Sequence, residues 1–478
     1  MQEQIDNTKE FATKPIPALL WQYAFPAVVT QIIATIYNIV DRVFLGQCVG
    51  ALAIAGLAIT MPIMNIVHAF GSLVGAGASA RMSIVLGRRD IRWAENILGN
   101  SMLLTFFFGA IFVSTWYIFA DEILGLFGAS ANTVAYARTY MNIVIPGMFL
   151  TTLSFNLTGL IRSSGYANKS MWILVSGALL NILLDAIFIY KLDWGIAGAA
   201  WGTTISMAFS SVLAITHFLQ PKSFIRFRSH CWKPRFYIFR NILAIGISPF
   251  SMNVAASAVV ALLNNQLLKY GGDNAVAASG VVKSFAPFVV MLVLGICQGM
   301  QPIAGYNYGA GKMDRLKAVY KLTMKWDVAI GCVGALLVLT IPRYLAMCFS
   351  NDANLIELCV PAFRLMLVMS PLIGFTITNS QFFQSIDKPW IAIVTSLSRQ
   401  VLFLTPLIYI VPPIFESFGG SGLIGVFFSC TISDVMGAAL SAALLRSQIK
   451  IFKPGYVPEE KKKIEKMKIN EYSSDNIN

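Results

Sequence analysis

Two aspartates stand inside long apolar stretches of this sequence, where an acidic side chain needs a specific partner. Asp41 lies in the stretch 17–45 and Asp185 in the stretch 170–190. A carboxylate in an apolar medium is costly, so acids at such positions commonly bind or relay an ion. Each acid lies a few residues before the end of its stretch, which puts both roughly 6–8 Å below one boundary of a helical layer. The two acids are therefore candidates for a shared ion site.

Polar residues on two neighbouring stretches complete this candidate site. Asn181 precedes Asp185 by one helical turn, so the two side chains share a helix face. In the next stretch, 195–219, Ala199 and Thr203 also share a face and lie at overlapping depths. Carboxylate, amide, hydroxyl and carbonyl oxygens together suit a proton or a hard cation such as Na⁺. We predict a coupling site for H⁺ or Na⁺ formed by Asp41, Asn181, Asp185 and Thr203, with the Ala199 carbonyl as a further ligand.

Asn156, in the stretch 135–161, is expected to extend this site deeper into the apolar layer. Burial and like charge disfavour two ionised carboxylates side by side, so at least one of the acids is expected to exchange a proton. An alternative stays open for both acids, because an acid that pairs with a nearby base only holds two helices together.

The other ionisable residues in the apolar stretches are expected to be structural. Asp434 has no acidic counterpart at the matching position, Met207. Lys283 and Arg399 could pair with Asp434 or with backbone carbonyls, and the sequence does not choose between these partners. Glu95 and Asp327 are expected nearer to the membrane interfaces, and the remaining embedded bases are Arg42 and Arg81.

The composition indicates that the apolar stretches cross a membrane. Of the 478 residues, 56% are hydrophobic and 12% are charged, whereas soluble proteins carry about 25% charged residues. A membrane span needs about 20 apolar residues. We predict an all-α integral membrane protein with twelve transmembrane helices at 17–45, 52–84, 94–119, 135–161, 170–190, 195–219, 241–269, 275–308, 318–342, 361–384, 390–411 and 422–446.

Basic residues gather in alternate connections between these stretches. Cytoplasmic loops of membrane proteins are rich in Lys and Arg, so this bias places both termini in the cytoplasm. The net charge of +13 then reflects loops beside anionic lipid, and we expect no nucleic-acid partner. The basic connections contain Arg88, Arg89, Arg92, Lys169, the segment 221–240, Lys312, Arg315, Lys317, Lys388 and the tail, whereas the others hold only Lys191 and Arg343.

The two halves of the chain are related by an internal repeat. GSLVGAGASARMSIVLGRRD (71–90) aligns with GICQGMQPIAGYNYGAGKMD (295–314), and GIAGAAWGTTIS (195–206) aligns with GLIGVFFSCTIS (422–433). Six spans per half is an even number, so the halves cross in the same sense, around a pseudo-twofold axis along the membrane normal. We therefore predict two six-helix bundles that flank a cleft. We divide the chain into a tail (1–14), a first half (15–220), a basic linker (221–240), a second half (241–447) and a basic tail (448–478).

No motif for catalysis is present. The sequence has no nucleophile elbow, HExxH or paired CxxC, and GAGASA (75–80) lacks the ending of a phosphate loop. His68, His217 and His230 share no ligand spacing. We therefore expect no enzyme, no catalytic residue and no cofactor beyond the coupling ion. The cysteines are scattered and are expected to be apolar core residues: Cys48, Cys231, Cys297, Cys332, Cys348, Cys359 and Cys430.

Four segments together resemble the multidrug and toxic compound extrusion (MATE) family, and within it the DinF/MepA-like bacterial branch. They are YNIVDRVFLG (37–46), NILLDAIFIY (181–190), GYNYGAGKMDRLK (305–317) and the paired TIS segments. The resemblance covers about 15–447. It implies a V-shaped pair of six-helix lobes and export of amphipathic, often cationic compounds in exchange for H⁺ or Na⁺. It also implies an amino-lobe cation site at Asp41, Asn181, Asp185, Thr203 and the Ala199 carbonyl.

One departure from the family bears on coupling. Another branch places acids in the seventh and tenth helices, but the stretches 241–269 and 361–384 contain none here. We therefore expect coupling through the first half. The expected mechanism is antiport with alternating access, giving multidrug efflux and antibiotic resistance. An apolar wall for varied substrates is predicted at Tyr37, Met64, Phe155, Phe285 and Met291.

Two alternatives remain open at this point. A lipid-linked oligosaccharide flippase of similar architecture would need a strongly cationic cavity, to which only Lys283 and Arg399 could contribute. A polytopic enzyme acting on lipids would need catalytic groups at an interface. We expect a monomer in a bacterial inner membrane, with the lipid bilayer and small molecules as its partners.

Overall fold

The computed structural model describes residues 7–48, 51–127, 133–221, 223–349, 352–453 and 456. Every regular element in this part of the chain is helical, as the sequence predicts. The predicted tails lie partly outside the described residues, and so do the side chains of Arg42 and Cys48. The predicted domain boundaries stay predictions.

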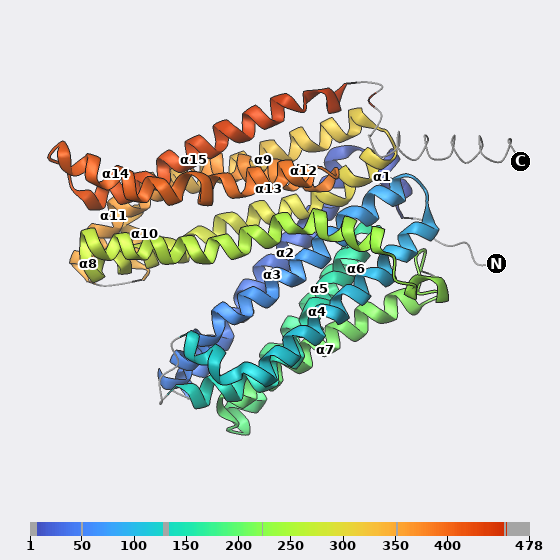
Figure 1. The fold of residues 1–478 in the computed structure, drawn as a ribbon, viewed down its shortest axis with the longest axis horizontal. Helices are drawn as coiled ribbons and strands as arrows, with labels where there is room; N and C mark the ends of the chain where they lie inside the picture. Colours follow the sequence, from blue (N-terminus) through green and yellow to red (C-terminus); the bar gives the residue numbers. More distant parts are fainter. Residues whose placement is uncertain are drawn as a thin grey trace, which may run out of the picture.

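Six long helices form a first group, which we call the amino bundle (Figure 1). Three of them contain an internal proline, Pro26, Pro62 or Pro146, which lipid-embedded helices tolerate because neighbouring groups satisfy the freed carbonyl. The bundle consists of α2 (Ile16–Cys48), α3 (Ala51–Gly87), α4 (Ile91–Leu126), α5 (Val134–Ser163), α6 (Ala167–Asp185) with the π-helical segment η1 (Ala186–Lys191), and α7 (Gly195–Leu219).

The second group, the carboxy bundle, begins after the short linker helix η2 (Ser229–Trp232). It consists of α8 (Phe236–Gly309), α9 (Met313–Thr340), α10 (Pro342–Met347), α11 (Ala353–Leu367), α12 (Ser370–Ser385), α13 (Pro389–Leu397) with the π-helical segment η3 (Ser398–Leu404), α14 (Thr405–Ser417) and α15 (Gly422–Ser447). The short helix η4 (Ile449–Phe452) follows it.

Helix α8 accounts for two of the predicted spans. It has 74 residues, far more than the ~20 that cross a bilayer. Its helical geometry breaks at Gly272, with φ 64° and ψ −165°, a conformation that glycine adopts without steric cost. The chain therefore turns back at Gly272, between the predicted stretches 241–269 and 275–308.

The described residues include ten helices long and apolar enough to cross a membrane. Helices α11 and α12, bent by 41° at their junction, make an eleventh if they count as one span. The predicted number is twelve, and the difference is the break inside α8, which joins two spans into one element. The chain is therefore a multi-pass membrane protein.

The two bundles meet at one end and diverge at the other, as the arms of a V (Figure 1). One hydrophobic core runs through the joined end and contains residues of both bundles, such as Leu160 and Phe382. Each arm has its own smaller core farther out, around Met141 in the amino bundle and Phe363 in the carboxy bundle. Shared packing holds the joined end closed, and separate packing lets the arms part. Both described chain ends lie at the joined end.

Glycines bring α3 and α8 into backbone contact at this joined end. A Cβ on Gly87 would lie 2.0 Å from the Tyr306 carbonyl oxygen, and a Cβ on Gly309 would lie 2.0 Å from the Ile84 oxygen. These two close approaches are reciprocal, which fits the repeat that relates 71–90 to 295–314. Small residues allow such close helix packing in membranes.

Polar contacts add to the closure of the joined end. Arg81 of α3, only 3% exposed, pairs with Asp387 of the α12–α13 turn at 3.2 Å. The short helix α1 (Lys9–Thr13) precedes the amino bundle but docks on the carboxy bundle, where Asn307 donates to the Phe11 carbonyl at 3.1 Å. These contacts tie segments far apart in sequence.

Candidate ion and substrate site

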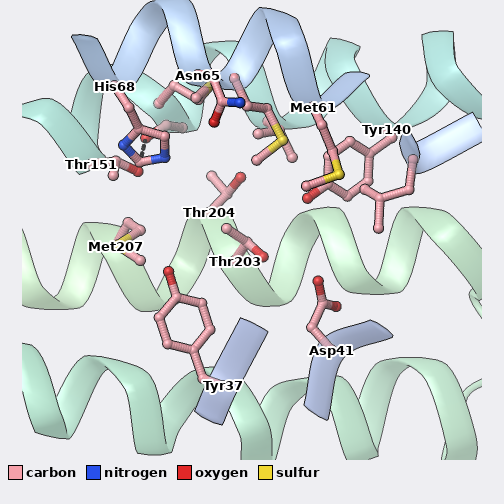
Figure 2. A pocket seen from close by; sticks show the side chains of 15 residues that line it. Tyr37, Asp41, Met61, Asn65, His68, Tyr140, Thr151, Thr203, Thr204 and Met207 are labelled. Carbon is pink, nitrogen blue, oxygen red and sulfur yellow. Dashed lines mark hydrogen bonds between the residues drawn. The ribbon is translucent and has the colours of Figure 1, made fainter. Parts of the chain in front are cut away.

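A cavity of about 120 Å³ opens inside the amino bundle. Figure 2 shows Asp41 and Tyr37 of α2 facing His68, Asn65 and Met61 of α3, with Thr203 of α7 between them. Tyr140, Val144, Met148 and Thr151 of α5 also line it, together with Leu57, Met64, Gly147, Thr204 and Met207. One carboxylate thus faces a wall of methionines, aromatic rings and hydroxyls.

Asp185 lies beside this cavity, at the carboxyl end of α6. Its side chain is 0% exposed, and neither carboxylate oxygen has a hydrogen-bond partner among the described residues. Its charge interacts with that of Asp41, so the structure brings together the two acids that the sequence singled out. A buried carboxyl without a hydrogen-bond donor is unfavourable when ionised. A bound proton or cation would relieve that cost.

The close approach of Asp185 to α7 depends on Gly202. A Cβ at Gly202 would lie 2.3 Å from the Oδ1 atom of Asp185. Any other residue would therefore push the carboxyl away from α7. The sequence alone gives no signal for Gly202, because its importance follows from a contact between two helices.

Asn181 links α6 to α7 beside the acids. The Asn181 Nδ2 atom donates to the Thr203 hydroxyl at 3.5 Å, and Thr203 and Tyr140 of α5 line the same cavity. The Oδ1 atom of Asn181 is buried with no hydrogen-bond partner in the described part of the chain. Ala199 is fully buried one turn before Thr203. Three predicted residues, Asn181, Thr203 and Ala199, therefore lie in one region beside the acids.

Asn156 lies against a different helix from the acids. Its Nδ2 atom donates to the hydroxyls of Ser101 and Thr105 on α4, at 3.2 Å each. The side chain is 0% exposed. These contacts place Asn156 in a neutral polar cluster between α4 and α5, so its predicted part in the ion site rests on the sequence alone.

A second cavity, of about 220 Å³, continues from the first toward the joined end of the V. The two cavities share Tyr37, His68, Thr151 and Met207. Arg162 and Gln298 lie at the wall of the second cavity, and Arg162 donates to the Gln298 Oε1 atom of the other bundle at 3.0 Å. The predicted stretch ended at 161 and so left Arg162 outside it, whereas α5 continues to Ser163.

The five residues predicted for a substrate wall divide into two sets. Tyr37, Met64 and Phe155 line the two joined cavities. Phe285 lines a smaller apolar pocket within the carboxy bundle. Met291 is a bundle-to-bundle contact, since its sulfur accepts from the Thr35 hydroxyl at 3.4 Å. The amino-bundle residues are thus better placed to contact a molecule in these cavities.

The structure decides the pairing of the embedded charges that the sequence left open. Arg399 pairs with Asp434 at 3.2 Å, and Lys283 donates to the Asn264 Oδ1 atom at 2.8 Å. Asp434 therefore holds η3 against α15, which is the structural role expected for it.

Two π-helical segments lie at embedded charged residues. One begins directly after Asp185, and the other contains Arg399. π-Helical turns inside helices often mark functional positions because they re-aim side chains. They also occupy the fifth and eleventh predicted stretches, which correspond in the repeat. Hydrophobic periodicity carries no signal for such a local change in winding.

A cluster of Glu95, His230 and Cys231 brings three groups of metal-ligand type together at the linker. Arg228 already pairs with Glu95 at 3.0 Å, and burial raises the pKa of the Cys231 thiol. Both features oppose cation binding, because one engages the carboxylate and the other keeps the sulfur protonated. The cluster instead fastens the linker to α4.

Comparison with known proteins gives a consistent result. The MatE family model matches residues 26–187 and 246–410. The multidrug export protein MepA of Staphylococcus aureus (strain MSSA476) is 26% identical over 448 residues, covering 92% of this chain and 96% of MepA. MepA of Staphylococcus saprophyticus is 26% identical over 441 residues, covering 91% of this chain and 95% of that protein.

Two solved structures share the fold. A MOP superfamily transporter from Pyrococcus furiosus, described as having a binding pocket of reversed polarity, gives a TM-score of 0.86 at 22% identity and covers 95% of this chain and 100% of that chain. An outward-facing multidrug resistance MATE family transporter gives the same values. The V-shaped, all-helical architecture is therefore that of MATE structures. With the family model matching most of its length, this chain belongs to the MatE family of membrane transporters.

Proposed function

We propose that this transporter exports amphipathic, often cationic small molecules in exchange for H⁺ or Na⁺. The observation that carries the proposal is Asp185, which is fully buried beside the amino-bundle cavity without a hydrogen-bond partner among the described residues. MepA, similar over nearly the whole chain, is named a multidrug export protein. The chain is a transporter and not an enzyme.

An ion at Asp185 and Asp41 would couple to the substrate through the shared cavity. Binding of a cation neutralises acids that face the space where a cationic compound would bind. An ion can drive transport only if it binds the two end states with different affinity. Because Asn181 and Thr203 connect α6 to α7 beside the acids, and Thr203 and Tyr140 line the same cavity, a change in charge there alters packing along the cavity. Alternating access of the cavity to the two membrane sides follows.

The stoichiometry determines which gradient drives export. Exchange of one H⁺ for one monovalent cation is electroneutral and uses only the pH gradient. Each additional ion adds about 2.3 kcal/mol per 100 mV of membrane potential.

The cavity lining fits varied apolar cations better than a lipid pyrophosphate. Methionine and aromatic side chains adapt to different shapes, and Met61, Met64 and Tyr37 supply them here. A flippase needs several free cations, but Arg399 is paired with Asp434, Lys283 donates to Asn264, and Arg162 at the second cavity donates to Gln298. The residues that line the cavity therefore favour drug export over lipid flipping.

The cellular setting forms part of the proposal. The charge bias of the loops places the joined end of the V, with both termini, in the cytoplasm. The arms then open to the outside. The cavities form within one chain, so a monomer suffices. A bacterial inner membrane and a contribution to antibiotic resistance complete the proposal.

Replacing Asp41 with asparagine tests the coupling site. We expect cells with the wild type to export ethidium in response to an imposed pH or Na⁺ gradient, and cells with Asp41→Asn to lose this response. Asp121→Asn is the matched control, because Asp121 is an exposed aspartate paired with Arg138 outside the cavity. Ethidium efflux is measured by fluorescence at equal expression. Unchanged gradient-driven efflux by Asp41→Asn would remove Asp41 from the mechanism.

Replacing Gly202 with alanine tests the close approach of Asp185 to α7. The added Cβ would meet the Asp185 Oδ1 atom at 2.3 Å, so the carboxyl must move. We expect gradient-driven ethidium efflux to fall about tenfold, or about 1.4 kcal/mol of coupling. Gly125→Ala is the control, because a Cβ there has no atom within 4 Å among the described residues. Equal efflux by the two variants would show that the position of Asp185 does not matter.

A further inference from the structure

One more buried acid, in the carboxy bundle, lies outside the site described above. Asp327 is near the middle of α9 in the carboxy bundle, and its side chain is 0% exposed. Asp327 is predicted from the sequence to lie nearer to a membrane interface, whereas it lies near the middle of its helix. Among the described residues it makes no ion pair, unlike Asp434, which pairs with Arg399. Its environment must therefore be explained by hydrogen bonds alone.

Both hydrogen bonds of the Asp327 side chain are made by one carboxylate oxygen. The Thr378 hydroxyl of α12 lies 2.6 Å from Oδ2, and the Cys297 sulfur of α8 lies 3.2 Å from it. The Oδ1 atom is buried with no hydrogen-bond partner in the described part of the chain. An ionised carboxylate prefers hydrogen-bond donors at both oxygens. Here only Oδ2 receives them, so the charge on Oδ1 is not stabilised.

The hydrogen atoms available at Thr378 fit a protonated Asp327. The Thr378 hydroxyl also lies 2.8 Å from the Gly374 carbonyl oxygen, but it has a single hydrogen to donate. With Asp327 ionised, Thr378 can donate to only one of these two oxygens. With a proton on Oδ2, Asp327 donates to Thr378, and Thr378 donates to Gly374. Both short contacts are then hydrogen bonds.

The groups around Asp327 offer no other source of charge compensation. Cys297 of α8 is the titratable side chain in contact with it, and α12 presents the neutral Thr378. The α9 lysines, Lys321 and Lys325, are exposed to the outside of the bundle. From α2, Trp21 packs on Trp326. On α11, Arg364 donates to the Leu339 carbonyl near the far end of α9.

The internal repeat singles out Asp327 as the acidic member of a pair of matching clusters. In the amino bundle, Asn156 of α5 contacts Ser101 and Thr105 of α4. A shift of 222 residues relates the first residues of α4 and α9 and the last residues of α5 and α12. The same shift relates Ser101 to Thr323, Thr105 to Asp327, and Asn156 to Thr378. The corresponding contact, between Thr378 and Asp327, is present in the carboxy bundle. The same packing position is neutral in one bundle and acidic in the other, so packing alone does not require an acid there.

We propose that Asp327 is a second proton-binding carboxyl, which gains and loses a proton during the transport cycle. The proposal rests on the proposed function, since it adds a coupling site to that exchange. The step is a simple equilibrium in which a carboxylate and a proton form a carboxylic acid. A proton fits better than Na⁺, because hard cations need several oxygen ligands and one of the few neighbours of Asp327 is a thiol.

A small, mainly apolar cavity lies close to Asp327. It lies between α8, α9, α11 and α12, and its lining includes Ser370, Gly374 and Ile377. Its volume is about 30 Å³. Gly374 lines this cavity, and a Cβ there would lie 2.7 Å from the Asp327 backbone oxygen. Movement of α12 against α9 would therefore change the packing around the acid.

Infrared spectroscopy of the purified protein tests proton binding at Asp327 directly. A protonated carboxyl has a C=O stretch that is separate from the carboxylate bands and shifts in D₂O. We expect this band in wild type minus Asp327→Asn spectra at low pH, and its loss as the pH rises. Thr378→Val should shift the band, because the acceptor of the proton is gone. Asp314→Asn, an exposed position in the first turn of α9, should leave it unchanged. Absence of the band at every pH would overturn the proposal.

Transport in proteoliposomes tests the role of this proton in coupling. If two protons exchange for one monovalent cation, each 100 mV of membrane potential changes the accumulation ratio by about 50-fold. We expect ethidium export by wild type to respond to a valinomycin-imposed K⁺ potential, and export by Asp327→Asn to respond to the pH gradient alone. An equal response to potential in both proteins would remove Asp327 from coupling. If neither transports ethidium, the proposed function fails, while the infrared result still decides proton binding.

Discussion

Asp185→Asn should abolish ion-driven export without weakening the protein. The carboxyl is fully buried and its oxygens have no hydrogen-bond partner among the described residues, so its ionised form is a cost to the fold. A buried polar group without partners typically costs about 1–3 kcal/mol. Asparagine has nearly the same shape and no charge. We expect gradient-driven ethidium export to fall about 100-fold, near the upper end of usual coupling strengths, while the free energy of unfolding stays within about 1 kcal/mol or rises.

The combination of these two results separates a functional acid from a structural one. Export is measured in proteoliposomes under an imposed pH or Na⁺ gradient, and stability by thermal unfolding of the purified protein. Asp434→Asn is the matched comparison, because it removes a buried acid that has a partner, Arg399 at 3.2 Å. Breaking such a pair leaves a charge uncompensated, so that variant should lose stability. If Asp185→Asn lost stability in the same way and kept specific export, Asp185 would be a structural residue.

Gly309→Ala should open the joined end of the V. The new Cβ would lie 2.0 Å from the Ile84 carbonyl oxygen, whereas a carbon and an oxygen normally stay about 3.3 Å apart. Helices α3 and α8 must therefore separate, at a typical overpacking cost of about 1–3 kcal/mol. That cost applies only to the state in which the joined end is closed. We expect the closed state to lose about tenfold or more in population relative to states with the joined end apart, because 1.4 kcal/mol is a factor of ten.

Spin-label distances measure this change. Labels at Arg92 of α4 and Lys317 of α9, both exposed, report on the two bundles; the exposed Cys332 and Cys348 are first replaced with serine. The distance distribution should lengthen in Gly309→Ala and in the reciprocal variant Gly87→Ala. Gly280→Ala, in the same helix, is the control, because its Cβ would have no atom within 4 Å among the described residues. Identical distributions in all four proteins would show that these contacts do not set the closed state.

The two bundles differ in how their polar clusters are arranged. The amino bundle has its acids beside an open cavity, at Asp41 and Asp185. The carboxy bundle has one acid inside its packing, at Asp327, and a second in an ion pair, at Asp434. A repeated fold thus carries different chemistry in its two halves, because a single substitution at a matching position changes a neutral contact into an ionisable one.

The sequence alone determined the features that depend on local properties. Stretch length and polarity predicted the helices, since burial of the backbone in lipid leaves few alternatives to a helix. The differences in span number arise at Gly272, where α8 continues through a turn, and at the bend between α11 and α12. Residues one helical turn apart, such as Asn181 and Asp185, were placed correctly on one face because helical geometry fixes that relation. The acids Asp41 and Asp185 stood out because charge in an apolar stretch is rare.

The tertiary structure alone decided which distant residues meet. Arg399 has several possible partners in the sequence, and the packing of η3 on α15 selects Asp434. Arg162 became a cavity residue because α5 extends past its apolar stretch and reaches Gln298 of the other bundle. Gly202 matters through its approach to Asp185, and Asp327 is buried by α8 and α12. In each case the decisive energy lies in contacts between helices, and residue order along one helix does not encode the position of another.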